Sequence, residues 1–573
     1  MGKAKIRWNE PLISQHESAA EGFTPEDFTE EDQLISKTTE SFVKNEVMPL
    51  LESIDQQDHE SVKKLFQKAG ELGLLSIEVP EEYGGLSLSK KLSGLVAEKM
   101  GAGGSFSVSF NIHAGVGTLP YIYYGTEEQK RKYLPKLASG EWIGAYALTE
   151  PGAGSDALNA KTTAVLNGEG TAWVLNGEKQ WITNAQVADV YVVFAKTAEG
   201  MTAFIVERSF KGVSIGPEEK KMGIKGSSTA TLILEEVEVP SNNVLGHGGK
   251  GHHVALNILN MARLKLAFSN IGMAKQALNL AVSYAKQRKQ FNKPIIGFSM
   301  IQEKIADMAI SIFGAESAAY RTADCLDHVL NSAEPLDDRL RKLTNYASEC
   351  AINKVHCSEI LDRNADEAVQ IHGGYGYMQE YEVERLYRDA RISRIFEGTN
   401  EINRLTIAKL MMKEVKQNGI SEPEAQLSSG ENRNRRFIQL SNRLFGKTLK
   451  ALKRSRVNIQ KEQEYARILA DMQKELYVME SAALRTEKAT KRYGSEKARL
   501  KEMMTNVICE EGFRKIEEMA VTALSGIESD EDEAERKLEL EEVHSLTLPL
   551  FSNLFAQKRE IAEKIAAHEK YTV

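Results

Sequence analysis

The sequence is poor in several features that mark particular classes of protein. Its 573 residues include only four cysteines, and no two of them form a CxxC pair. This spacing argues against a zinc site and against a disulfide framework. We therefore expect no metal centre and a reduced, cytoplasmic compartment.

Long apolar runs and an excess of positive charge are also missing. No run of about 18 apolar residues occurs, and the segment Met1 to Ile6 lacks an apolar signal region. The chain has 73 Lys and Arg residues against 81 Asp and Glu residues, a formal net charge of −8. The sequence thus predicts a cytoplasmic protein of bacterial type, with no membrane span and no nucleic-acid partner.

What is present is a globular composition, with 42% hydrophobic and 27% charged residues. At roughly 150 residues per domain, the length predicts about four domains. Helical spacing predicts an N-terminal helical domain, and β-rich runs predict a middle antiparallel β domain with hairpin turns at Asn167-Gly168 and Asn176-Gly177. Helical periodicity then predicts a four-helix bundle and a wholly helical extension. The expected domains span residues 1–145, 146–252, 253–418 and 431–573.

One stretch of the extension departs from the negative average. Residues 432–461 hold ten Lys or Arg residues and no Asp or Glu. On a helical wheel, Leu440, Leu444 and Leu449 fall on one half, and the basic residues fall on the other. This is the pattern of helices that lie on anionic membrane surfaces. An equally good alternative is a helix packed on the rest of the extension with a solvated basic face.

Three short motifs could carry chemistry. Residues 146–156 are rich in Gly and hydroxyl groups, so they could bring backbone N–H groups close to a ligand, or form an ordinary surface turn. Trp181 and Thr183 fall on one face of a predicted strand, where they suit a planar heterocycle, although a core Trp is as good an interpretation. Glu397 stands beside Gly398, where a solvated helix-end residue is the plainer alternative.

The ordered set of motifs decides between these alternatives. The chain resembles the acyl-CoA dehydrogenase family over residues 30–415, and the extension resembles that of its very-long-chain subgroup. The matches, in the family's order, are the Thr-Glu-Pro-Gly-x-Gly-Ser-Asp loop, the Trp-Ile-Thr-Asn strand, Arg288–Phe291, Gln370–Gly374 and Phe396–Thr399. The resemblance implies a mainly α fold with a central β domain, a four-helix bundle and a C-terminal helical domain. In the subgroup, the extension is linked to peripheral membrane association, which favours contact of residues 432–461 with the inner membrane surface.

The resemblance also implies FAD, bound between the β domain and the bundle. Residues implied at the flavin ring and ribityl chain are Tyr146, Leu148, Thr149, Gly154, Ser155, Trp181 and Thr183. In this family the neighbouring subunit completes the pyrophosphate and adenine end, so a homodimer is implied. The matching positions are Arg288, Gln290, Phe291, Gln370, Gly373 and Gly374, with Thr399 and Glu401 near the nucleotide of the subunit's own FAD. Read without the resemblance, Arg288 is a solvated charge, and His372 is a packed side chain rather than an adenine contact.

The implied reaction is α,β-dehydrogenation of a long-chain acyl-CoA in fatty acid β-oxidation. Glu397 would remove the C2 proton while hydride passes from C3 to flavin N5. Some family members carry the base just before the position of Arg263, but Ala262 stands there. Substrate contacts are implied for Ser155, Asn260, Arg263 and Gly398.

Electrons would pass to an electron-transfer flavoprotein. The alternatives are an acyl-CoA oxidase, which passes electrons to oxygen, and a non-catalytic assembly protein that keeps the fold.

Overall fold

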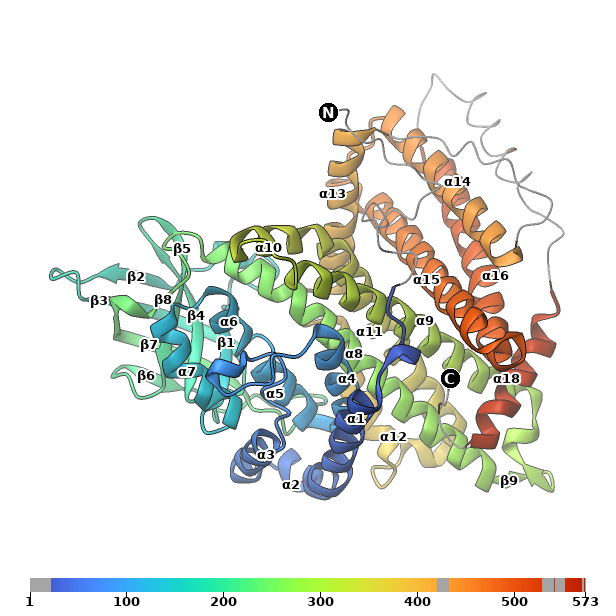
Figure 1. Ribbon diagram of the computed structural model, residues 1–573, viewed down its shortest axis with the longest axis horizontal. Helices are drawn as coiled ribbons and strands as arrows, with labels where there is room; N and C mark the ends of the chain where they lie inside the picture. Colours follow the sequence, from blue (N-terminus) through green and yellow to red (C-terminus); the bar gives the residue numbers. More distant parts are fainter. Residues whose placement is uncertain (1–21, 420–431, 528–540, 542–551, 569–570, 572) are drawn as a thin grey trace.

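The computed structural model of the chain describes residues 22–419, 432–527, 541, 552–568, 571 and 573. The parts follow one another across the molecule (Figure 1): the β-sheet lies at one end, long helices cross the middle, and the C-terminal helices form the other end. This arrangement confirms the predicted fold class.

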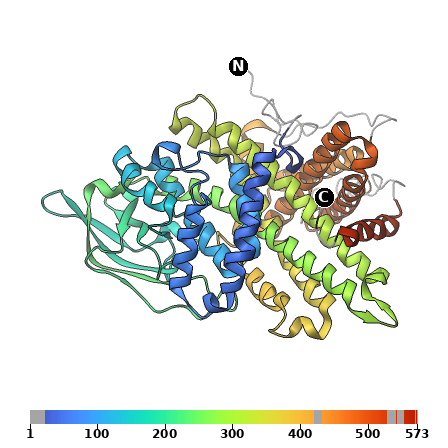
Figure 2. The ribbon, with the colours of Figure 1, turned by 60° about the horizontal axis from the view of Figure 1, so that its bottom comes forward.

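The first part of the chain is a layer of helices that packs against both the sheet and the long helices (Figure 2). Its helices are α1 (Glu30–Phe42), α2 (Leu51–Asp55), α3 (His59–Glu71), α4 (Lys90–Met100), α5 (Gly104–Ala114), α6 (Leu119–Tyr124) and α7 (Glu127–Ser139). Capping boxes begin α1 at Thr29 and α7 at Thr126. Gly140 ends α7 with a φ of 74°, which glycine adopts without strain.

The middle part is an eight-stranded sheet. Its strands are β1 (Gly144–Ala147), β2 (Thr163–Leu166), β3 (Ala172–Thr183), β4 (Val190–Thr197), β5 (Gly200–Glu207), β6 (Val213–Ile215), β7 (Thr229–Pro240) and β8 (Val244–Leu245). The order is β6-β7-β3-β2-β4-β5-β8, and β1 pairs with β4. Most neighbours are antiparallel as predicted, but β1 and β2 run parallel to β4.

The two Asn-Gly pairs behave differently. Asn167-Gly168 lies in the turn between β2 and β3, where Asn167 Oδ1 accepts the Thr171 N–H at 3.0 Å. The prediction of a second hairpin at Asn176-Gly177 is wrong, because that pair lies inside β3. There the pairing of β3 with β7 shifts register between Leu175 and Gly177, so the glycine marks a bulge.

The helices that follow form the bundle. They are α8 (Gly251–Gln287), α9 (Ser299–Leu330), α10 (Leu336–Leu343), α11 (Ala347–His372), α12 (Glu382–Ala390) and α13 (Asn400–Asn418), with the hairpin β9 (Lys289–Gln290) and β10 (Lys293–Pro294) after α8. Helices α8, α9 and α11 pack against one another, and α13 packs on α11. Rows of buried alanines on α8, such as Ala274, Ala277 and Ala281, allow this close approach.

The extension adds α14 (Arg433–Arg454), α15 (Gln463–Tyr493), α16 (Ser495–Ser525) and α18 (Leu554–His568). Helix α15 packs on α9, where the hydroxyls of Tyr477 and Thr322 lie 2.6 Å apart. The acidic stretch of residues 528–542 falls almost entirely outside the described residues.

Helix α14 does not offer an apolar face to a membrane. Its residues Phe437, Leu440, Leu444, Leu449 and Leu452 are buried in a core shared with α15 and α16. The prediction that this face lies in a membrane surface is therefore wrong, because the same leucines are used to pack the extension. None of the described helices is long and apolar enough to cross a membrane.

A buried arginine ties the extension to the rest of the molecule. The Arg485 side chain is 1% exposed and pairs with Glu316 of α9 at 3.0 Å and with Glu26, near the start of the described chain, at 2.7 Å. The Tyr571 hydroxyl, near the other end, donates to Glu316 at 2.6 Å. This cluster joins four residues that are far apart in sequence.

Candidate functional site

Glu397 and Gly398 form a strained loop directly before α13. Glu397 has a φ of 56° and Gly398 a φ of 81°. A left-handed conformation is uncommon for a residue with a side chain, and such residues gather at functional sites. The Thr399 hydroxyl then accepts the Ile402 N–H at 3.3 Å and caps α13.

Three side chains donate hydrogen bonds to the backbone carbonyl groups of this loop. Arg263 Nε donates to the Glu397 carbonyl at 3.2 Å, and its Nη1 donates to Asn260 Oδ1 at 3.0 Å. Lys354 Nζ donates to the Gly398 carbonyl at 2.9 Å, and Asn403 Nδ2 donates to the same carbonyl at 2.8 Å. The loop is thus fixed from α8, α11 and α13 at once.

The electrostatics of the loop suit a base. Burial raises the pKa of Glu397, and the charges of Arg263 and Lys354 oppose that rise. Burial lowers the pKa of Lys354 to about 7, although Glu397 counteracts this. Glu397 Oε2 is buried and has no hydrogen-bond partner among the described residues. A carboxylate that is desolvated but not paired is free to take a proton from a ligand.

A cavity opens beside this carboxylate, between α5 and α8. Its apolar lining comes from Val108, Ile112, Val116, Ala262, Leu266 and Phe396, and Asn111, Lys265 and Ser269 also line it. The cavity is small, with a volume of about 40 Å³, and it adjoins the carboxyl group of Glu397.

The sheet supplies the opposite wall of the site. The Tyr146 hydroxyl is buried with no partner in the described part of the chain, and both burial and Glu397 raise its pKa well above the usual value. Leu148 and Thr149 follow it, and their carbonyls accept from Lys179 Nζ at 3.3 Å and from the Gln180 N–H at 2.9 Å. These bonds fasten the glycine-rich loop to β3.

Trp181 and Thr183 lie at the end of β3, as predicted, but alternation alone does not place them. The register of β3 against β7 shifts between Lys179 and Ile182, and Trp181 has a φ of 58°. The indole is 59% exposed, whereas Ile182 is buried. The bulge therefore presents a flat aromatic surface outward near the glycine-rich loop. Gly154 and Ser155 of that loop are exposed, and so is Glu401 at the start of α13.

The remaining predicted residues gather at the far end of α8. Arg288 lies 5.5 Å from the ring centroid of Tyr375, so the two motifs after α8 and α11 meet. This exposed group consists of Arg288, Gln290, Phe291, Gln370, Gly373 and Gly374. Phe291 is 88% exposed, which is unusual for a phenylalanine side chain. His372 is buried, donates or accepts at the Ala368 carbonyl (2.7 Å) and stacks on Tyr284, so the packed alternative is right.

Sequence reasoning missed Lys354, Asn403, Asn111 and Lys265. Each is a polar side chain on a predicted helix, where a solvated face is the ordinary interpretation. Only the packing of α5, α8, α11 and α13 reveals that these four contact the loop of Glu397 or line the cavity beside it.

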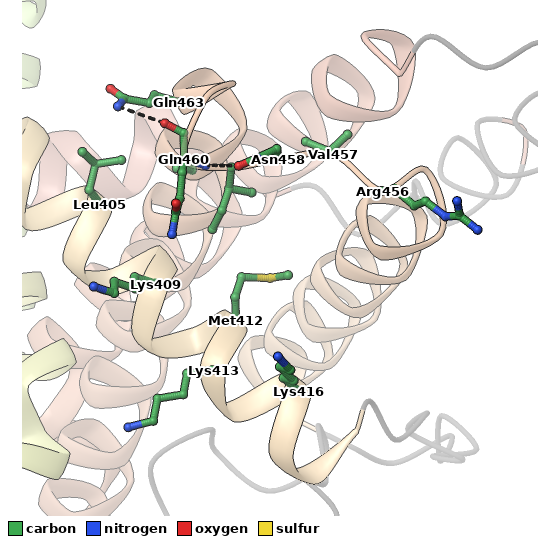
Figure 3. A pocket seen from close by; sticks show the side chains of 12 residues that line it. Leu405, Lys409, Met412, Lys413, Lys416, Arg456, Val457, Asn458, Gln460 and Gln463 are labelled. Carbon is green, nitrogen blue, oxygen red and sulfur yellow. Dashed lines mark hydrogen bonds between the residues drawn. The ribbon is translucent and has the colours of Figure 1, made fainter.

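A larger groove lies elsewhere, between α13 and the segment that joins α14 to α15. Figure 3 shows Met412 reaching from α13 toward this segment, where Asn458 Oδ1 accepts the Gln460 N–H at 3.0 Å. None of the candidate residues lines it. Among the described residues, no group of His, Cys, Asp and Glu is placed to hold a metal ion.

The comparisons with known proteins agree with this geometry. Models of the N-terminal, middle and C-terminal domains of acyl-CoA dehydrogenase match residues 29–141, 145–237 and 249–412, and a second C-terminal domain model matches residues 448–541. A probable acyl-CoA dehydrogenase of Bacillus subtilis is 49% identical over 574 residues, 96% of each chain. The very long-chain specific enzyme of Mus musculus is 40% identical over 65% of this chain and 58% of its own.

A solved structure extends the match to the extension. The crystal structure of a Bacillus anthracis acyl-CoA dehydrogenase complexed with FAD has a TM-score of 0.94 and 45% identity, and all of both chains is covered. Taken together, the four domain matches and the whole-length likeness show that the chain belongs to the acyl-CoA dehydrogenase family, with the additional C-terminal helical domain.

Proposed function

We propose that the protein is an FAD-dependent dehydrogenase that converts an acyl-CoA to its trans-2-enoyl-CoA. The observation that carries this proposal is the buried Glu397 Oε2, which has no hydrogen-bond partner among the described residues and lies at a mainly apolar cavity. The likeness to the very-long-chain subgroup favours a long acyl chain, whereas polar side chains in the cavity favour a shorter one.

The residues opposite Glu397 fit a flavin. The buried Tyr146 hydroxyl lacks a partner within the described chain, and a side chain at Gly152 or Gly154 would meet no atom within 4 Å. Tyr146, Leu148, Thr149, Gly154 and Ser155 would hold the ring and ribityl chain, with Trp181 and Thr183 covering the ring. When bound, FAD supplies the acceptor for the hydride that leaves C3 of the substrate.

Glu397 would take the C2 proton on its free Oε2. Its desolvation raises its pKa and makes it a stronger base, while Arg263 and Lys354 keep the pKa low enough for the carboxylate to form. The Glu397 backbone N–H would donate to the thioester carbonyl, where negative charge develops. Asn260, Arg263, Ser155 and Gly398 would contact the CoA thioester.

The active form would be a homodimer. Arg263 and Arg288 are 25 residues apart along α8 and its end, about 37 Å at 1.5 Å per residue. Arg288 therefore lies too far from Glu397 of its own chain to hold the same flavin. With Gln290, Phe291, Gln370, Gly373 and Gly374 it would bind the pyrophosphate and adenine of the neighbouring subunit's FAD. Thr399 and Glu401 would lie near the nucleotide of the chain's own FAD.

Flavin bleaching tests the proposal. The purified protein should be yellow, and anaerobic addition of a saturated acyl-CoA should bleach it. Glu397→Gln should keep its flavin and bleach about 10²–10⁴-fold more slowly, because the general base is lost. Wild-type bleaching by this variant would refute the assignment of the base.

The same experiment distinguishes between the possible electron acceptors. We expect electrons to pass to an electron-transfer flavoprotein, so the bleached enzyme should reoxidise slowly in air. Fast reoxidation by oxygen would instead identify an acyl-CoA oxidase. A colourless protein that no acyl-CoA alters would favour an assembly role.

A further inference from the structure

A groove of about 920 Å³ lies between α13 and residues 455–462, the segment that joins α14 to α15. We call it the α13 groove. None of the residues proposed for catalysis or for FAD lines it. Its volume falls within the range of about 300–1,000 Å³ that is usual for small-molecule sites. It is much larger than the cavity of about 40 Å³ beside Glu397.

The floor of the α13 groove is apolar. Four half-buried side chains pack there on the core of the extension: Leu405, Met412, Val457 and Ile459. Because these side chains are half-buried rather than protruding, they line a hollow and are poorly placed to enter a bilayer. An acyl chain laid on this floor would lose contact with water and gain apolar contacts.

One side of the α13 groove carries three lysines. Lys409, Lys413 and Lys416 lie at positions i, i+4 and i+7 of α13, so they share one face of the helix (Figure 3). Their side chains are exposed and have no ion pair within the described chain. Arg456 adds a fourth cation from the facing segment, and no Asp or Glu of the described residues lines the groove. Its positive charge is therefore uncompensated.

The helix dipole explains only part of this charge. A lysine in the last turn of a helix complements the negative end of the dipole, and Lys416 has that position in α13. Lys409 lies more than two turns before the end at Asn418, where the effect of the dipole has faded. The row of lysines needs a further explanation, and an anionic ligand provides one.

The wall that faces the lysines is held by its own hydrogen bonds. The Asn458 carbonyl accepts the N–H groups of Lys461 and Glu462 at 2.9 and 2.8 Å. Glu462 Oε2 in turn accepts the Asn458 N–H at 2.8 Å, so the acid of this turn is used within the turn. The groove is thus formed before any ligand arrives, which lowers the cost of binding.

We propose that the α13 groove binds a molecule of acyl-CoA outside the active site. From Lys409 to Lys416 the lysines extend over about 10 Å of helix, farther than the single carboxylate of a fatty acid reaches. CoA carries a diphosphate and a separate 3′-phosphate, so it can meet several lysines while its acyl chain lies on the apolar floor. The proposal goes beyond the proposed catalysis, because this site does not use Glu397.

The size of the α13 groove argues against a protein partner. Twelve residues line it. A stable protein–protein interface takes about 20–30 residues on each side. A small anionic amphiphile therefore fits the groove better than a second protein does.

Equilibrium binding to the holoenzyme, measured by calorimetry, tests the proposal. The probe is S-dodecyl-CoA, a thioether that cannot be dehydrogenated because it lacks the carbonyl that makes the C2 proton acidic. We expect two equivalents per chain, one at the proposed active site and one at the α13 groove. A single equivalent that is kept when the lysines of the groove are replaced would overturn the groove site.

Replacement of the lysines identifies the groove equivalent. The triple variant Lys409→Gln/Lys413→Gln/Lys416→Gln should bind it about tenfold more weakly, because several exposed ion pairs of modest strength are lost together. The flavin content and the other equivalent should not change. A protein with one equivalent that this variant loses would keep the groove site and contradict the proposed active site instead.

A matched control removes the same amount of charge elsewhere. Lys37, Lys44 and Lys64 are exposed lysines of the N-terminal helical layer, far from α13 in sequence. Lys37→Gln/Lys44→Gln/Lys64→Gln should bind both equivalents as the wild type does. An equal loss in the control would show that net charge, and not the α13 groove, holds the second equivalent, and would overturn the proposal.

Competitors and vesicles test the identity of the ligand. CoA alone and dodecanoate alone should each displace the groove equivalent poorly, since each offers only part of the contacts. Displacement by dodecanoate as strong as by S-dodecyl-CoA would overturn the assignment in favour of a free fatty acid. Sedimentation with anionic phospholipid vesicles that the triple lysine variant loses, with only one equivalent of probe bound, would overturn it in favour of a membrane surface.

Discussion

At the scale of single residues, the proposed base Glu397 depends on the charges of Lys354 and Arg263, which donate to the backbone carbonyls of its loop. Lys354 is buried in α11 and reaches both the Gly398 carbonyl and Asn400 Oδ1, at 2.9 and 2.7 Å. Its pKa of about 7 means that it is charged mainly below neutral pH. In that range its charge, together with that of Arg263, helps to keep Glu397 ionised.

Replacement of Lys354 should therefore shift the pH dependence of the reaction. Loss of the ammonium in Lys354→Met should raise the pKa of Glu397 further. Because the proposed base must be ionised, activity should then begin to fall at a higher pH when the solution is acidified. We expect the acid limb of kcat/KM against pH to move upward by about one unit. Lys354→Arg should restore it. An unchanged acid limb in a variant that keeps its flavin would reduce Lys354 to a structural role.

Glu397 could be proposed as the base from the sequence because its neighbours Gly398 and Thr399 complete a recognisable motif. The contacts of Lys354 and Asn403 could not be predicted, because nothing local distinguishes a lysine or asparagine that donates to this loop from one on a solvated face. Asn111 and Lys265 are alike in this respect. Their roles arise only from contacts between helices that are far apart in sequence.

At the scale of elements, β3 positions the predicted flavin residues through a buried ion pair. Lys179 is 0% exposed and Glu150 is 5% exposed, and their charged atoms lie 2.6 Å apart. Glu150 also accepts from the backbone and hydroxyl of Thr162 at 3.0 and 2.6 Å. The pair closes the glycine-rich loop onto the strand that carries Trp181.

Loss of this buried ion pair should lower the free energy of unfolding far more than loss of an exposed ion pair. Glu150→Gln leaves the Lys179 charge buried, and we expect a loss of about 3–5 kcal/mol in unfolding free energy and a lower flavin content. The double variant Glu150→Gln/Lys179→Met should recover part of the loss. As a control, Glu60→Gln removes an exposed pair with Lys63 and should cost less than about 1 kcal/mol. Equal losses in denaturant melts would contradict this account.

Helices and turns were predicted correctly from the sequence where a single local signal dominated. Helical periodicity and Asn167-Gly168 gave correct elements, because each acts over a few neighbouring residues. Asn176-Gly177 carries the same local signal but forms a bulge, since β7 pairs with β3 on both sides of it. The apolar stripe of α14 likewise could not reveal whether its partner is lipid or α15 and α16.

At the scale of the whole molecule, the distance between the two halves of the proposed FAD site predicts complementation between subunits. A chain with Arg288→Glu keeps its own Glu397 but offers no cation to its partner's pyrophosphate. A chain with Glu397→Gln keeps Arg288 but lacks the base. Their heterodimer contains one site with both residues intact.

Each variant alone should be inactive or nearly so, and co-expressed chains should regain activity. Because half of randomly paired dimers are mixed and each has one intact site of two, about a quarter of wild-type activity is expected. Differently tagged chains allow the mixed dimer to be isolated and assayed. A mixed dimer without activity would show that Arg288 serves its own chain.

The Arg485 cluster also sets an order of events during synthesis. Glu26 is made 459 residues before Arg485, its partner in the finished protein. At about 5–20 residues per second, the ribosome needs about 25 to 90 seconds to cover that interval. Throughout this time Glu26 lacks the guanidinium that pairs with it, and once α9 is made, its face that receives α15 stays open. The nascent chain therefore carries every residue of the proposed active site before Arg485 is present to complete this buried cluster.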